Sequence, residues 1–174
     1  MSPSPFMVEW IDRTARERGT GGGALDVAMG RGRHTIALAR AGFRAFGVDI
    51  NAGEVVAASQ RAAAEGLRLH AWCADLATHP LPVSRFAVVV VARYLQRDLF
   101  PALAGAVRPG GIVLYETFTT AQLRLGTGPR SPDHLLAPGE LRRRFEGFEI
   151  LFYEEAEGPD AVARLAARRV SQAK

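Results

Sequence analysis

The chain has 174 residues, of which 48% are hydrophobic and 23% charged, as expected for one globular domain with a core of its own. The net charge is +4, and all but one of the 22 basic residues are arginines, so a nucleic-acid partner must be considered. The arginines are spread along the chain, and the one tight run, Arg142–Arg144, is expected to be a solvated helix face. A nucleic-acid partner is therefore not favoured, and it is kept as an alternative.

No apolar run approaches the roughly 20 residues that a membrane-spanning helix needs. The first ten residues lack the basic start and apolar core of a signal peptide. We therefore expect a cytoplasmic protein without a membrane partner. The single cysteine, Cys73, follows an apolar run and is expected to be a reduced core residue rather than a catalytic one.

The first half of the sequence alternates between helix and strand patterns. An N-terminal helix is expected within residues 1–19, and Gly66 is a good C-terminal cap for a later helix. The predicted elements after the first helix are a strand at Ala24–Ala28, a helix at His34–Ala41, a strand at Arg44–Val48, a helix at Ala52–Glu65 and a strand at Leu67–Trp72.

The second half opens with a loop at His79–Pro82 and a predicted strand at Arg85–Val91. Four consecutive valines, Val88–Val91, are typical of a strand buried on both faces of a parallel sheet. The further predicted elements are a helix at Asp98–Val107 that Arg108–Gly111 ends, a strand at Ile112–Glu116, a helix at Gly139–Phe145, and two strands at Glu149–Glu154 and Ala161–Val170.

A long irregular segment, Thr117–Pro138, separates the fifth predicted strand from the last helix. Loops of this length within a compact domain are usually functional, so we expect a lid over the substrate. Five parallel strands with helices on both faces are followed by two strands whose pairing is expected to be antiparallel. The sequence thus predicts a single α/β domain over residues 1–174, with a doubly wound, Rossmann-like, mostly parallel seven-stranded sheet.

The segment from Ala24 to Asn51 carries the clearest functional pattern. Gly30 and Gly32 stand between a strand and a helix, and Asp49 follows Gly30 by 19 residues at the end of the next strand. Such glycines let the backbone approach a nucleotide-type cofactor, and such an acid holds its ribose. The alternatives are a plain glycine turn and an Asp49 that caps the next helix. A dinucleotide site is disfavoured, because Thr35 stands where its third glycine belongs.

These residues, from Leu25-Asp26 through Gly30 and Gly32, resemble the first motif of class I S-adenosylmethionine-dependent methyltransferases. The resemblance extends to Asp49, to Asp75-Leu76 and to the turn Arg108–Gly111. It implies S-adenosylmethionine as the cofactor, with Asp26 near the methionine end, Asp49 on the ribose and Asp75 at the adenine amino group. The chain departs from the family in having Ala28 and Met29 where a glycine and a cysteine are common.

The same resemblance implies cofactor contacts from further residues at the ends of the strands: Ala28, Met29, Gly30, Gly32, His34, Ile50, Leu76, Ala92 and Arg93. More narrowly, Tyr94–Arg97, Tyr115–Phe118 and Gly126–Leu136 resemble small bacterial methyltransferases of the tellurite-resistance type. This second likeness implies a small substrate. No residue of the sequence is assigned to a metal.

The acceptor pocket is expected where the fourth and fifth strands end. Glu116 is the predicted base, if the nucleophile arrives protonated, and Tyr94 is expected to orient the nucleophile or else to pack in the core. Arg93 and Arg97 are predicted to clamp an anion through their planar forks. The alternative for Arg97 is a pair with Asp98 or a helix cap.

Together these patterns predict methyl transfer from S-adenosylmethionine to a small molecule. The acceptor is expected to be anionic or a soft sulfur, selenium or tellurium nucleophile. The alternatives are a methyltransferase-like module that binds or modifies RNA, and a non-catalytic subunit that binds the cofactor for a partner. The sequence leaves the oligomeric state open.

Overall fold

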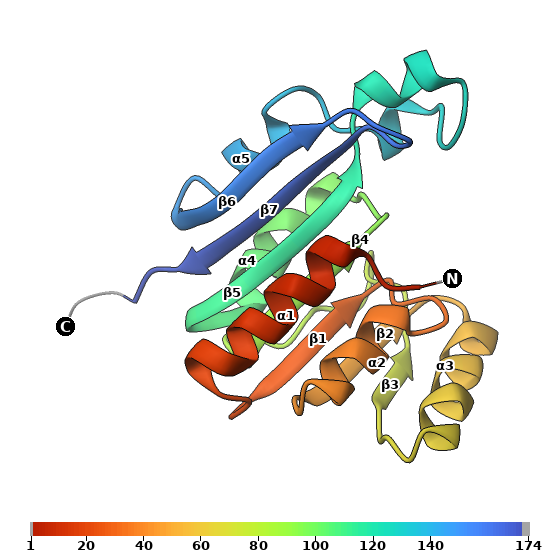
Figure 1. Cartoon of the computed structure of the whole chain (residues 1–174), viewed down its shortest axis with the longest axis vertical. Coiled ribbons are helices and arrows are strands. Elements are labelled where there is room, and N and C mark those ends of the chain that lie inside the picture. The colour runs from red at the N-terminus through yellow and green to blue at the C-terminus, as the bar shows by residue number, and fades with distance from the viewer. Residues whose placement is uncertain (1, 172–174) are drawn as a thin grey trace.

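A seven-stranded sheet in the order β3-β2-β1-β4-β5-β7-β6 forms the centre of the protein in the computed structural model, which describes residues 2–171 (Figure 1). Strands β1 to β5 are parallel, and β7 runs antiparallel to both β5 and β6. The mostly parallel sheet with an antiparallel end is therefore confirmed. The strands are β1 (Gly23–Val27), β2 (Arg44–Asp49), β3 (His70–Cys73), β4 (Phe86–Ala92), β5 (Val107–Phe118), β6 (Phe148–Ala156) and β7 (Val162–Arg169).

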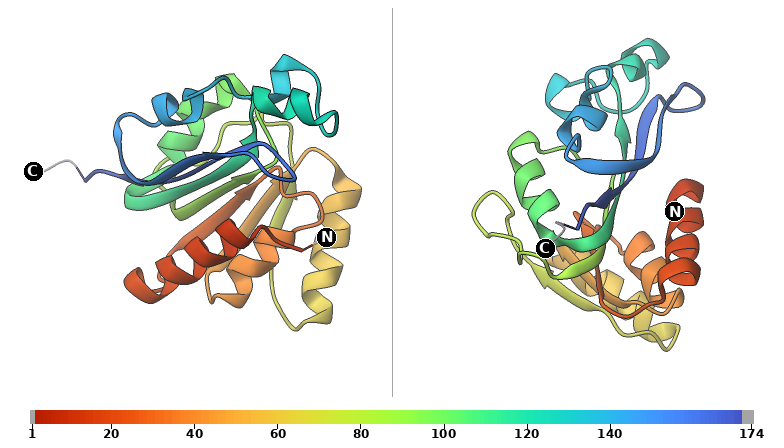
Figure 2. Two further views of the ribbon diagram at one scale, coloured as in Figure 1. Left: turned by 45° about the horizontal axis from the view of Figure 1, so that its top comes forward. Right: turned by 90° about the vertical axis from the view of Figure 1, so that its left-hand side faces the viewer.

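Helices cover both faces of the sheet, as the doubly wound arrangement requires (Figure 2). One face carries α1 (Pro5–Arg18), α2 (Arg33–Arg40) and α3 (Ala52–Ala64). The other carries α4 (Phe100–Ala106), which a 3₁₀ turn at Arg97–Leu99 precedes, and α5 (Glu140–Arg144). Within residues 2–171, no helix has the length and apolar character that crossing a membrane would need.

The four valines of β4 are fully buried, as the sequence predicts. Val88 and Val90 contact the core layer under α1 and α2, whereas Val89 and Val91 contact the layer under α4 and α5. Successive strand side chains point to opposite faces, so a central strand between two helical layers needs an apolar residue at every position.

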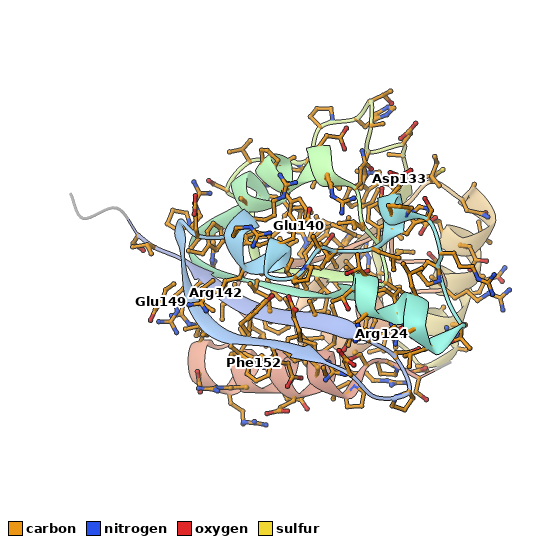
Figure 3. The ribbon with its side chains drawn as sticks, turned by 90° about the horizontal axis from the view of Figure 1, so that it is seen from above. Arg124, Asp133, Glu140, Arg142, Glu149 and Phe152 are labelled. Carbon is orange, nitrogen blue, oxygen red and sulfur yellow. The ribbon has the colours of Figure 1, made fainter. Side chains whose placement is uncertain are left out.

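Helix α1 ties the beginning of the chain to its last strands. Pro5 stands at the start of the helix, where a missing N–H costs nothing. The rings of Phe6 and Trp10 contact Phe152 of β6 at 5.6 and 6.2 Å between centroids, and Figure 3 shows Phe152 beside this helix. The helix therefore packs on one face of the sheet, beside β5, and reaches β6 through Phe152.

Three local predictions are wrong. Strand β3 begins at His70 rather than Leu67, and Cys73 is exposed rather than in the core. Cys73 is the last residue of a strand at the edge of the sheet, so apolar neighbours in the sequence did not imply burial there. The segment Arg108–Gly111 belongs to β5 itself, and a register irregularity between β4 and β5 accommodates it.

Candidate functional site

The turn between β1 and α2 has a left-handed backbone at alternate positions, with φ of 54° at Ala28, 51° at Gly30 and 73° at Gly32. A side chain at Gly32 would also collide with Ala58 of α3, since an added Cβ would lie 2.8 Å from that residue's Cβ. At Gly30 an added Cβ would meet no protein atom, so glycine serves the backbone conformation there. Ala28 holds the same conformation without that freedom, which marks a strained residue at this turn.

Asp49, at the end of β2, connects this turn to the neighbouring strand. Its Oδ2 accepts a hydrogen bond from the Gly30 N–H at 2.8 Å, and its Oδ1 accepts one from the Asn51 N–H at 2.9 Å. The cap of α3 is Asn51, whose side chain accepts from the N–H groups of Gly53 and Glu54. Asp49 is therefore not the helix cap, and its carboxylate is oriented at the carboxyl edge of the sheet.

Asp26 lies beneath the turn and is 1% exposed. Burial raises the pKa of this carboxyl to about 7, against the opposing hydrogen bond from Thr35 Oγ1 at 2.7 Å. Thr35 is itself fully buried, and its hydroxyl binds Asp26 at the position where a dinucleotide motif has its third glycine. A role for Thr35 in the site was not predicted, although a polar residue on the buried face of α2 is a signal for one.

Two adjoining cavities open at the carboxyl ends of the parallel strands, and they share Ala28. The smaller, the acid cavity, has a volume of about 240 Å³. The larger, the arginine cavity, has a volume of about 460 Å³. The acid cavity is lined by Ala28, Val48, Asp49, Ile50, Ala74, Asp75, Leu76 and Tyr94. The arginine cavity is lined by Ala28, Met29, Gly30, Arg31, Arg33, His34, Glu54, Arg61, Ala92 and Arg93.

The structure thus gathers most of the expected cofactor residues around these two adjoining cavities. Asp26 and Gly32 are the exceptions, since neither lines a cavity. Tyr94, expected at the acceptor, lies in the acid cavity instead. Burial and nearby carboxylates raise the pKa of Tyr94, so its phenol stays protonated at neutral pH and is a hydrogen-bond donor.

A hydrogen-bonded chain joins the N-terminal segment to the far strands beside the arginine cavity. The Ser4 N–H donates to His34 Nε2 at 3.1 Å, and the Ser4 hydroxyl donates to Glu116 Oε2 at 3.1 Å. The same carboxylate oxygen accepts from Arg164 Nε at 2.6 Å. Burial, aided by Arg33 and Arg93, lowers the pKa of His34 to about 3, so the ring is neutral at pH 7. Sequence reasoning missed Ser4 and Arg164, because both act across long sequence separations.

Arg93 and Arg97 lie in different parts of the structure, although the sequence predicts that both clamp one anion. Arg93 lines the arginine cavity, where it pairs with Asp160 at 2.8 Å and lies over the Phe118 ring. Arg97 lines neither cavity. It pairs with Glu140 rather than Asp98, so its fork is occupied by a partner from α5.

The Arg97–Glu140 pair fastens the segment after β5. Arg97 Nε and Nη2 donate to the two Glu140 carboxylate oxygens at 2.8 and 3.0 Å, and Nη2 also donates to the Leu135 carbonyl at 2.8 Å. Seen from above, Glu140 lies at the start of α5 and Asp133 lies in the segment that Arg97 holds (Figure 3). Within the predicted lid, Leu135 and Leu136 are buried in the core, whereas Leu123 and Leu125 are exposed. The base of the predicted lid is therefore fixed, and its exposed tip is bound through Gln122, whose Nε2 donates to the Thr127 carbonyl at 3.0 Å.

Replacing Glu140 by glutamine is expected to destabilise the protein by about 2 kcal/mol at pH 7. The hydrogen bond from Arg97 is the main cause that lowers the pKa of Glu140 from 4.5 to about 2. A depressed pKa stabilises the fold above pH 4.5, and this stability is lost as the pH falls from 4.5 towards 2. Urea unfolding across this range measures it. Glu157→Gln, which removes an exposed pair with Arg124, is the control. Equal effects of the two variants would contradict the role of the buried pair.

Comparison with known proteins adds independent findings. Residues 24–111, half of the chain, match the model of the methyltransferase domain family. No curated protein sequence matches. A solved structure concerned with the conversion of a disulfide bond into a thioacetal group during echinomycin biosynthesis is 24% identical, with a TM-score of 0.73 over 99% of this chain and 84% of that chain.

Two further solved structures share the fold. TehB from Haemophilus influenzae is 17% identical, with a TM-score of 0.73 over 92% of this chain and 62% of that chain. An S-adenosylmethionine-dependent methyltransferase from Methanosarcina mazei is 16% identical, with a TM-score of 0.74 over 98% of this chain and 99% of that chain. The presence of TehB agrees with the narrower resemblance in the sequence. With the motif turn, the strand-end acids and the sheet order, the match shows that the chain belongs to the methyltransferase domain family, as a class I S-adenosylmethionine-dependent methyltransferase.

Proposed function

We propose that the protein transfers the methyl group of S-adenosylmethionine to a small-molecule acceptor at the arginine cavity. The observation that carries this proposal is the pair of adjoining cavities, which share Ala28 as a lining residue. They lie at the carboxyl ends of the strands, where ligands of doubly wound sheets bind. The volume of the arginine cavity, about 460 Å³, is in the range of small-molecule sites.

The residues of the acid cavity fit the adenosine half of the cofactor. The Asp49 carboxylate has acceptor capacity left for ribose hydroxyls, because each oxygen receives only one backbone hydrogen bond. Asp75 is exposed at the cavity and uses Oδ1 to accept from the Ala77 N–H. Ile50 is 68% exposed, and an exposed apolar side chain at a cavity wall is suited to cover a purine ring.

The arginine cavity is proposed to hold the methionine end and the acceptor. The bound cofactor supplies an electrophilic methyl group, and the protein's task is to align the acceptor with it and to exclude water. Arg93 uses only Nη2 for its pair with Asp160, and its remaining donors are proposed to bind an anionic acceptor. Glu116 is the proposed base for an acceptor that arrives protonated. Ser4 and Arg164 hold Glu116 in place, so they are proposed as positioning residues.

A small acceptor is favoured over RNA. Arg33 donates to the Ser2 carbonyl and His34 accepts from the Ser4 N–H, so residues 2–4 border the arginine cavity. The arginines of this cavity are also engaged: Arg31 with Glu54, Arg61 with the Arg31 carbonyl, and Arg93 with Asp160. A bordered cavity with engaged cations suits a small ligand better than a phosphate backbone.

The test is calorimetric titration with S-adenosylhomocysteine, followed by transfer of a tritiated methyl group to a panel of acceptors. The panel contains thiols and hydrosulfide, selenium and tellurium oxyanions, carboxylates, amines and a structured RNA. The relative concerned with disulfide-to-thioacetal conversion makes sulfur nucleophiles the first class to try. We expect cofactor binding and transfer to at least one small acceptor. Transfer to RNA alone, or cofactor binding with no transfer to any member, would contradict the proposal.

Binding of the cofactor is expected to release a fraction of a proton near pH 7. The pKa of buried Asp26 is about 7, and a cation bound nearby favours its ionised form, so affinity should rise with pH through this range. Calorimetry in two buffers of different ionisation enthalpy counts the protons. S-adenosylmethionine should release more than S-adenosylhomocysteine, which lacks the sulfonium charge. Release that persists in Asp26→Asn would assign the proton to another group.

The tip of the segment after β5, around Gly126–Arg130, is proposed to close over the acceptor. Its base is fixed, because the Thr120 N–H donates to the Leu136 carbonyl and the Leu136 N–H donates to the Phe118 carbonyl, both at 2.9 Å. Arg124 and Arg130 are exposed and are sites for trypsin. We expect cleavage there to be fast in the free protein and slow with cofactor and acceptor both bound. Equal rates, with occupancy confirmed, would contradict closure.

A further inference from the structure

A third cavity, with a volume of about 730 Å³, opens at the opposite edge of the sheet. The beginnings of neighbouring strands form it: Gly23 of β1 is in register with Arg44 of β2 and with Phe86 of β4, and Phe46 of β2 is in register with His70 of β3. It shares no residue with the acid or arginine cavities. The proposed methyl transfer therefore leaves this aromatic cavity unexplained.

The aromatic cavity exists because no described helix covers this part of the sheet. The chain between β3 and β4, residues 74–85, runs as a loop on the side of α4 (Figure 2), while α4 packs against β4 and β5. The rings of Phe46 and His70 are stacked at 4.9 Å, and Trp72 and Phe86 complete an aromatic wall. Half-buried aromatic rings around a hollow of this size are suited to a flat ligand.

The charged side chains that line the aromatic cavity are all positive. Arg44, Arg85 and Arg108 line it, and none of the lining residues is acidic. Within residues 2–171, no hydrogen bond or salt bridge engages these three guanidinium groups. Partial burial, with Arg44 and Arg68 nearby, lowers the pKa of His70, so the ring remains neutral at pH 7. Arg44 lies over the Phe46 ring, 5.1 Å from its centroid, a contact that leaves its N–H donors open. Guanidinium groups without a hydrogen-bond or salt-bridge partner are suited to bind a carboxylate, sulfonate or phosphate.

We propose that the aromatic cavity is a second ligand site, which takes a small planar aromatic anion. The aromatic wall would stack on the ligand ring, and Arg44 and Arg85 would bind its acidic group. Both arginines lie at the amino ends of strands, and neither lines the acid cavity or the arginine cavity. This site would therefore be filled independently of the cofactor.

Naphthalene-2-sulfonate is the probe, and naphthalene-2-sulfonamide is its neutral counterpart of matching shape. The chain has two tryptophans, so a Trp10→Phe variant leaves Trp72 as the only indole, and its fluorescence reports on the cavity. Titrations are run with S-adenosylhomocysteine at saturation, so that the cofactor site is already filled. We expect saturable quenching by the sulfonate, with affinity about tenfold above that of the sulfonamide.

The double variant Arg44→Gln/Arg85→Gln should weaken sulfonate binding by about tenfold or more. Arg142→Gln, which alters an exposed arginine without a side-chain partner among the described residues, should leave binding unchanged. Circular dichroism confirms that each variant is folded. Equal binding of sulfonate and sulfonamide, no effect of the double variant, or quenching that saturating S-adenosylhomocysteine abolishes would each overturn the proposal.

Discussion

Replacing Asp49 by alanine is expected to weaken binding of S-adenosylhomocysteine by roughly a hundredfold or more, since each hydrogen bond to a charged group is worth about 1.5–3 kcal/mol. The carboxylate is proposed to accept from two ribose hydroxyls. It also accepts from the Gly30 N–H at 2.8 Å and the Asn51 N–H at 2.9 Å. The variant therefore loses ribose contacts and releases the glycine turn, while the buried sheet beneath remains intact.

The two contributions can be separated with a cofactor that lacks one hydroxyl. In the parent protein, 2′-deoxy-S-adenosylhomocysteine should bind more weakly than S-adenosylhomocysteine. In Asp49→Ala the two should bind alike, because the partner of the missing hydroxyl is gone. Asp12→Ala, an exposed acid on α1, is the control and should bind as the parent does. If the deoxy compound loses as much affinity in Asp49→Ala as in the parent, another residue holds the ribose.

Gly47→Ala is expected to lower stability by about 1–3 kcal/mol, the usual cost of overpacking a core, and to weaken cofactor binding as well. An added Cβ would lie 2.0 Å from Met29 Sδ and 3.2 Å from Thr35 Cγ2. Thr35 is fully buried and has no room to shift away from the added Cβ, so Met29 must move. Because Met29 lines the arginine cavity and its N–H donates to the Val48 carbonyl, its displacement distorts the motif turn.

A second substitution tests this explanation. Met29→Ala in the Gly47→Ala background should recover part of the lost stability, although Met29→Ala alone should destabilise the protein. Gly105→Ala is the matched control, since an added Cβ in α4 meets no atom, and alanine is favoured within a helix. Thermal unfolding compares the four variants with the parent protein. If Met29→Ala only adds to the loss caused by Gly47→Ala, the collision with Met29 is not its cause.

The sequence predicted the fold well where the pattern was local and repeated. The valines of β4 indicated a strand buried on both faces, and the alternation of elements indicated a doubly wound sheet. The errors fell at element ends. Cys73 follows apolar residues but ends an edge strand, and burial at a strand end depends on whether another element covers it, which periodicity does not encode.

The sequence predicted the part of the candidate site whose residues all belong to one local motif. Gly30 and Asp49 were found because their spacing is a property of one strand–helix–strand unit. Contacts across the sheet were not found. Glu116 meets Arg164 because β5 and β7 are antiparallel with these two residues in register, and one residue of slip would send each side chain to the other face. Arg97 meets Glu140 from 43 residues away, so the fold had to be known first.

The position of β7 between β5 and β6 has a consequence for synthesis on the ribosome. β6 leaves the ribosome before β7, but in the described chain β6 pairs with β7 alone. Until Val162–Arg169 emerge, β5 of the nascent chain has a long unpaired edge on the side where β7 will pair. Unpaired edges of this kind recruit other chains. The growing polypeptide is therefore most prone to aggregate just before β7 is complete. By then the turn between β1 and α2 has long been synthesised.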